Sequence, residues 1–130
     1  MRLFCYGTLM IPAVWQRVVG RGASACDALL KNYERRRMQG KAYPGLVRKA
    51  GAQTRGVVYQ QLNEHDLRRL DRYEGRQYKR VRVSVCLSDD NVVCSWCYVT
   101  RARYTNLLGR EYWSLRDFVD NDLQTYLRRI

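Results

Sequence analysis

A short apolar strand that runs straight into a glycine constrains this chain more than any other feature. Residues 3–6 are apolar and predict a buried strand, and Gly7 follows them directly. Glycine permits backbone angles that a side chain forbids, and Pro12 suits the first turn of a helix. Because the strand, the turn and the beginning of the helix lie so close together, several backbone N–H groups point at one position. Residues 6–9 are therefore predicted to hold a carboxylate or a developing oxyanion.

Further strand patterns recur along most of the chain. Two extended segments are predicted to join near Lys31 and Asn32, and turn chemistry follows at Tyr43, Pro44 and Gly45. Gly51 is predicted to turn the chain back into another strand, and residues 89–91 to link a hairpin. The predicted strands cover residues 3–6, 24–30, 33–38, 56–62, 78–85 and 92–99.

Three helices are predicted between and after these strands. The first spans residues 13–19 and stops at Gly20. The second begins at the N-cap Asn63 and runs to Gly75. The third is capped by Ser114 and carries one apolar stripe, formed by Leu115, Phe118, Val119, Leu123, Tyr126 and Leu127. The order of elements indicates an α+β fold with a small, mixed, barrel-like β-sheet and flanking helices.

Composition points to one compact unit, predicted to span residues 1–130. Hydrophobic residues make up 46% of the chain, and no apolar run approaches the length of a membrane span. The first 26 residues resemble a secretory signal only loosely, because Gly7, Pro12 and several polar side chains interrupt them. The five cysteines are odd in number and scattered, which favours a reducing cytoplasm over a disulfide framework.

The net charge of +12 would attract any polyanion. Nucleic-acid binding is one interpretation, supported by arginines such as Arg35, Arg36 and Arg37 that are interleaved with aromatic residues. The alternatives are a solvated surface, or a basic cleft that steers an anionic substrate.

Metal, redox and triad chemistry find little support. The single histidine, His65, is predicted on an exposed helical turn. Cys94 and Cys97 form a C-x-x-C pattern inside a strand-like segment with no second pair. Because they alternate with Trp96 and Tyr98, ordinary sheet packing explains them. No metal and no cofactor is expected.

Glu74 is the strongest candidate for acid–base chemistry. It closes the second helix on the face that carries Leu67 and Leu70, which would bring its carboxylate to the margin of the core. Desolvation there would raise its pKa and make it a general base near neutrality. The alternative is an exposed glutamate paired with Arg76 or Lys79, and the residues alone favour that alternative.

Two ordered motifs resemble the γ-glutamylcyclotransferase-like family. The first is Y-G-T-L at residues 6–9, and the second is L-D-x-x-E-G at residues 70–75. Shorter segments resemble the same family in the same order, at residues 43–45, 56–59, 78–80 and 96–99.

The resemblance implies a small mixed barrel whose cavity binds a γ-glutamyl substrate and releases 5-oxoproline by cyclisation. Glu74 matches the family's catalytic glutamate. The implied substrate-binding residues are Tyr6, Gly7, Thr8 and Leu9, together with Tyr43, Tyr78 and Tyr98. A non-catalytic module of the same fold that binds a small anion is the alternative hypothesis, and a basic nucleic-acid-binding domain is the third.

Overall fold

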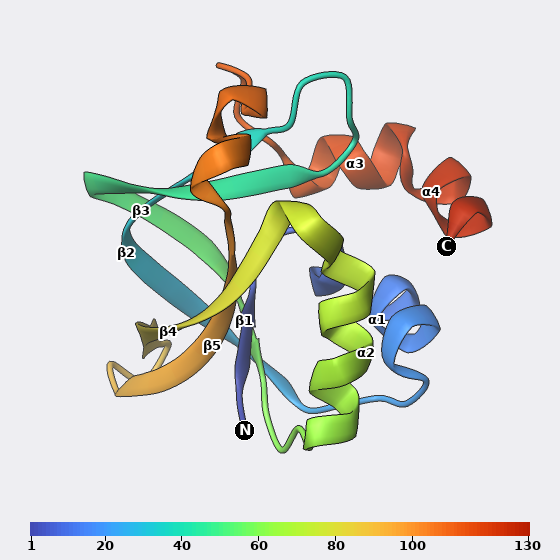
Figure 1. Ribbon diagram of the computed structural model, residues 1–130. Helices are drawn as coiled ribbons and strands as arrows, with labels where there is room; N and C mark the ends of the chain where they lie inside the picture. The colour runs from blue at the N-terminus through green and yellow to red at the C-terminus, as the bar shows by residue number, and fades with distance from the viewer.

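Five strands close into a barrel at the centre of the protein (Figure 1). The computed structural model describes all residues 1–130. β1 and β5 pair in parallel, and the other neighbouring strands pair antiparallel. This architecture confirms the predicted α+β class with a barrel-like sheet. The strands, in barrel order, are β1 (Leu3–Cys5), β3 (Pro44–Tyr59), β2 (Ala25–Arg37), β4 (Tyr78–Leu87) and β5 (Val92–Thr100).

The α-helices gather on one side of the barrel, at the right of Figure 1. They are α1 (Pro12–Val19), α2 (Glu64–Glu74), α3 (Leu115–Asn121) and α4 (Leu123–Arg129). Short 3-10 turns connect them to the strands, namely η1 (Thr8–Met10), η2 (Gly75–Gln77) and η3 (Ala102–Leu107). No helix here combines the length and the apolar sequence that a membrane span requires.

Strand alternation separates two hydrophobic clusters. Side chains such as Phe4, Leu30 and Val85 come from every strand and fill the barrel interior. Their neighbours along the strands point outward and pack against the helices. In this outer layer Trp15 of α1 stacks on Tyr59 of β3, with ring centroids 3.7 Å apart. The outer layer therefore fixes the helices against the barrel.

Helix α2 begins and ends where the sequence predicts. Asn63 accepts a hydrogen bond from the Asp66 N–H, and the Asp66 carboxylate accepts one from the Asn63 N–H, which forms a capping box. At the other end Gly75 adopts a φ of +74°, which ends the α-helix at Glu74. The two ends together set the position of Glu74.

The β2–β3 hairpin is longer than predicted. Asn32 and Gly51 were expected to turn the chain, but both lie inside continuous strands with positive φ angles. The Gly51 N–H donates to the Asn32 side-chain oxygen at 3.0 Å, so the two residues form a paired irregularity across the hairpin. Pro44 and Gly45, also predicted as a turn, are the first residues of β3, and the chain reverses over residues 39–43.

The predicted C-terminal helix is two helices. The helical hydrogen bonding breaks at Asp122, whose φ of −121° is not helical, and α4 starts afresh at Leu123. The break separates the buried Phe118 of α3 from Tyr126 of α4, yet the two rings still meet edge to face at 5.3 Å. The bend places α4 beside the outer layer.

Candidate active site

A cavity of about 170 Å³ lies between the outer face of the barrel and the helices. Its walls come from η1, the C-terminal end of α2, the start of β4, and α4. Pockets for drug-sized ligands span roughly 300–1,000 Å³, so this cavity suits a fragment of amino-acid size. All eight residues predicted from the sequence line it, namely Glu74, Tyr6, Gly7, Thr8, Leu9, Tyr43, Tyr78 and Tyr98.

Glu74 projects into this cavity from the last position of α2. It forms no ion pair, and the two expected surface partners, Arg76 and Lys79, are exposed and also unpaired. Burial, followed by the negative charge of Asp71, raises the pKa of Glu74 to about 8. The carboxyl group can therefore accept and return a proton near neutral pH.

The glycine of the opening motif packs closely against Pro44. Gly7 has a φ of −127° and a ψ of −138°, so it does not use the left-handed region that favours glycine. A Cβ atom there would lie 3.0 Å and 3.1 Å from two ring carbons of Pro44. The Gly7 N–H donates to no other group of the chain, so it is free to meet an oxygen atom in the cavity.

Three contacts hold the loop of residues 6–9 in place. An Nη atom of Arg35 donates to the Tyr6 carbonyl at 2.8 Å, and the Tyr59 hydroxyl donates to the Leu9 carbonyl at 2.7 Å. The Tyr6 hydroxyl donates to the carbonyl of Tyr98, on the neighbouring strand β5, at 2.6 Å. Because two of its carbonyls and the Tyr6 side chain are already hydrogen-bonded, the loop is held in place without a ligand.

The tyrosines of the cavity wall use their hydroxyl groups for anchoring. Tyr78 donates to the Pro44 carbonyl at 2.6 Å, and Tyr98 donates to the Asp71 carboxylate at 2.6 Å. Burial is the largest cause that raises the pKa of both phenols. They remain neutral and present mainly ring surface to the cavity.

Two further tyrosines, which the sequence did not predict as site residues, also line the cavity. The Tyr73 hydroxyl lies 2.8 Å from the Thr8 hydroxyl and hydrogen-bonds to the hydroxyl of Tyr126. The position of Tyr73 beside Glu74 in the second motif was an available signal. Tyr126 gave no such signal, because in the sequence it belongs to an apolar helical stripe. Gln77 and Cys5 also line the cavity.

Metal-binding groups do not converge anywhere in the chain. No cluster of three or more His, Cys, Asp or Glu side chains is close enough to hold an ion. Cys94 and Cys97 lie three residues apart on β5, so they point to opposite faces, and Cys94 is exposed while Cys97 is fully buried. All five cysteines are free thiols.

The fold and the two motifs define a small barrel protein with a single carboxyl group in its cavity. Residues 3–115 match the family model described as "Gamma-glutamyl cyclotransferase, AIG2-like". The chain therefore belongs to the AIG2-like γ-glutamylcyclotransferase family. The match ends at the first residue of α3, so Tyr126 lies beyond it.

Curated relatives from Arabidopsis thaliana support the assignment. Protein AIG2 C is 32% identical over 89 residues, which cover 68% of this chain and 54% of that protein. AIG2-like protein C is 31% identical over 87 residues, which cover 67% of this chain and 51% of that protein. The chain thus spans about half the length of these curated relatives.

Solved structures share the same fold. An Arabidopsis thaliana protein determined in solution has a TM-score of 0.77 at 24% identity, over 98% of this chain and 78% of that chain. A γ-glutamyl cyclotransferase has a TM-score of 0.69 at 18% identity, over 99% of this chain and 86% of that chain. A yeast γ-glutamyl cyclotransferase specific to glutathione has a TM-score of 0.66 at 15% identity, over 85% and 73%.

Proposed function

We propose that this protein is a γ-glutamylcyclotransferase that releases 5-oxoproline from a γ-glutamyl amine or a γ-glutamyl amino acid. The observation that carries the proposal is Glu74, an unpaired carboxyl group with a pKa of about 8 that shares a small cavity with the loop of residues 6–9. Membership of the AIG2-like γ-glutamylcyclotransferase family supports it.

The reaction is an intramolecular aminolysis. The α-amine of the γ-glutamyl group attacks its own γ-carbonyl carbon, a C–N bond forms and closes a five-membered lactam, and the original amide C–N bond breaks. The attacking nitrogen loses one proton and the leaving nitrogen gains one, so no water is consumed. Glu74 takes the first proton as a general base and returns it as a general acid. The nucleophile belongs to the substrate, and binding in a folded-back conformation supplies the proximity.

The loop of residues 6–9 binds the substrate and stabilises the oxyanion in this mechanism. When the amine attacks, negative charge develops on the γ-carbonyl oxygen, and a fixed backbone N–H stabilises that charge more in the transition state than in the ground state. The free N–H of Gly7 is available for this purpose. The rings of Tyr43, Tyr78 and Tyr98 enclose the glutamyl part and exclude water.

A substrate panel tests the proposal directly. The purified protein is incubated with γ-glutamyl amines and γ-glutamyl amino acids, and 5-oxoproline is measured by mass spectrometry. We expect turnover of at least one compound and a loss of at least 100-fold in kcat for Glu74→Gln, since general acid–base catalysis contributes about 10²–10⁴-fold. Glu111→Gln is the matched control, because Glu111 is exposed and makes no side-chain contact with the cavity.

Two results would contradict the proposal. Equal turnover by Glu74→Gln and Glu111→Gln would remove Glu74 from the mechanism. Saturable binding of a γ-glutamyl compound with no 5-oxoproline would instead identify a ligand-binding module of the same fold.

A further inference from the structure

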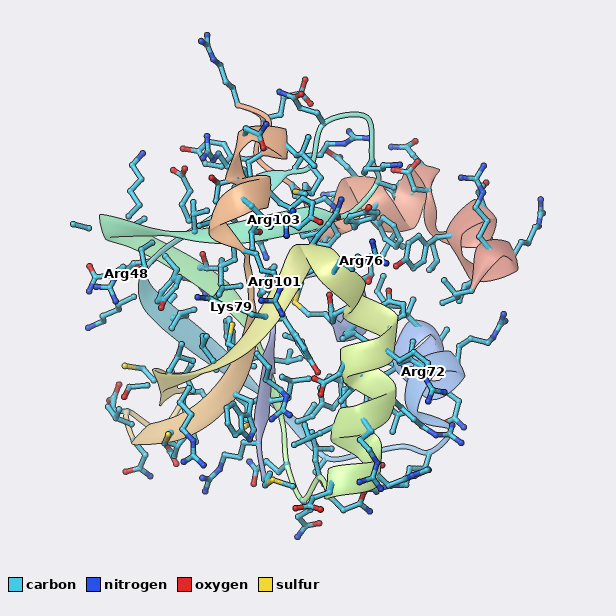
Figure 2. All side chains as sticks on the ribbon, viewed as in Figure 1. Arg48, Arg72, Arg76, Lys79, Arg101 and Arg103 are labelled. Carbon is cyan, nitrogen blue, oxygen red and sulfur yellow. The ribbon has the colours of Figure 1, made fainter.

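A band of basic side chains crosses the protein outside the cavity. Figure 2 shows it running from α2 over η2 and the start of β4 to η3, with Arg48 of β3 further out. We define the basic band as Arg72, Arg76, Lys79, Arg101 and Arg103, all of them exposed.

Backbone contacts bring the members of this band together. The Arg101 N–H donates to the Gln77 carbonyl at 2.8 Å, and the Arg101 side chain donates to the Tyr78 carbonyl at 3.2 Å. Arg101 is thereby placed between Arg76 and Lys79, which flank these two carbonyls in the sequence. The band continues along α2, where Arg68 precedes Arg72 by one turn, or about 6 Å along the helix axis.

No acidic side chain neutralises the band. None of its five members takes part in an ion pair. Of the two nearest acids in α2, Asp71 is held by Arg80 and Tyr98, and Glu74 faces the cavity. Neighbouring like charges on a helix repel each other by a few tenths of a kcal/mol per pair. A bound anion would relieve that repulsion.

The layout of the band indicates what kind of anion fits. It extends over four elements, which is more than one small phosphate could contact, and four of its five members are arginines. The guanidinium group pairs with phosphate oxygens in a bidentate manner. An extended series of phosphates matches such an arrangement, and the net charge of +12 would speed its association.

We propose that the basic band binds the phosphodiester backbone of a nucleic acid, without reading its base sequence. Contacts from arginine and lysine to phosphates position the strand but carry no sequence information. This inference is independent of the cyclotransferase proposal, because the band and the cavity share no residue.

Charge-matched variants test the inference. Binding of fluorescent 20-nucleotide oligothymidine and oligouridine is followed by anisotropy at 50 mM salt and above. The band variant carries Arg72→Gln, Lys79→Gln and Arg103→Gln, and the control carries Lys31→Gln, Lys41→Gln and Arg110→Gln, at exposed positions elsewhere. Each triple variant lowers the net charge from +12 to +9 (12 − 3). Because both variants lose the same charge, a loss of affinity in the band variant alone depends on where the charges lie.

We expect the band variant to lose at least tenfold in affinity and the control to stay within about threefold. The slope of log K against log salt becomes shallower by roughly 2 in the band variant, because each phosphate contact on a single strand contributes about 0.7. Both oligonucleotides should bind with similar affinity. Thermal melting verifies that each variant is folded. If the band variant does not fold, the single variants Arg72→Gln and Arg103→Gln are used in its place.

Several outcomes would overturn the inference. They are the absence of oligonucleotide binding by the wild-type protein at 50 mM salt, an equal loss in the band and control variants, and a tenfold preference for one oligonucleotide. Vesicles containing phosphatidylserine provide the last arm. Binding to these vesicles without binding to oligonucleotides would assign the band to a membrane surface instead.

Discussion

Asp71 and Glu74 are one helical turn apart at the end of α2, and their carboxyl groups lie in opposite environments. Asp71 accepts two hydrogen bonds from Arg80, at 2.9 Å and 3.3 Å, and one from Tyr98 at 2.6 Å. Burial alone would raise the pKa of Asp71, but these contacts hold it below its ordinary value. Glu74 has no such partner, and the charge on Asp71 helps to raise its pKa. Asp71 is thus ionised at neutral pH, while Glu74 has a pKa of about 8.

The pH dependence of turnover follows from this pair. In the proposed mechanism Glu74 must be ionised before the substrate binds in order to act as a base, and its pKa is about 8. We therefore expect kcat/KM to rise from pH 6, to reach its midpoint near pH 8 and to level off above about pH 9. Asp71→Asn removes the neighbouring charge and keeps an acceptor for Tyr98, so the midpoint should move to lower pH. A profile that is flat above pH 6 would show that Glu74 titrates like an ordinary glutamate.

Glu74 should reduce the stability of the folded protein at neutral and alkaline pH. Its pKa is raised from 4.5 in the unfolded chain to about 8 in the folded one, so its favourable contribution is complete below pH 4.5 and is lost as the pH rises through 8. We expect Glu74→Gln to be more stable than the wild type by on the order of 5 kcal/mol at pH 8.5, since the pKa is raised by about 3.5 units (8 − 4.5) and one unit corresponds to about 1.4 kcal/mol. Urea unfolding at pH 4.5, where the difference should vanish, is the control.

Gly7→Ala should damage both stability and turnover. Its Cβ would lie 3.0 Å from Pro44 Cγ, so either the loop or the start of β3 must shift. Overpacking of this kind costs about 1–3 kcal/mol, and a displaced loop would lower kcat by more than tenfold. Gly22→Ala is the matched control, because no atom lies within 4 Å of the added methyl group. Equal melting temperatures and rates for the two variants would contradict this reading of Gly7.

Tyr126 should limit which leaving groups the cavity accepts. It reaches the cavity from α4, and its hydroxyl contacts Tyr73 and lies 3.5 Å from the Thr8 hydroxyl. We expect Tyr126→Phe to raise KM a few-fold with little change in kcat. Tyr126→Ala opens this wall, so kcat/KM for substrates with bulky leaving groups should improve relative to small ones. An unchanged ratio between a small and a bulky substrate would exclude Tyr126 as a determinant of specificity.

The sequence was informative where a short segment determines its own structure. The strand before Gly7, the helix between Asn63 and Gly75, and the hairpin of β4 and β5 depend on local alternation, capping and turn residues. Asn32 and Gly51 misled the same reasoning. Both are typical turn residues. In the β2–β3 hairpin the Gly51 N–H donates to the Asn32 side chain, so the two strands continue through them.

The sequence by itself predicted the barrel class and eight of the residues that line the cavity. Five of the eight lie in the two ordered motifs, and Tyr43, Tyr78 and Tyr98 lie in the shorter segments of the same resemblance. Only the tertiary structure decided between the two states of Glu74, the exposed ion pair and the unpaired carboxyl group in a cavity. Only the tertiary structure also placed Tyr126 in the cavity. This residue comes from α4 and lies 52 positions after Glu74 in the sequence. A pKa depends on desolvation and on charges that distant segments bring close, and no local pattern records those distances.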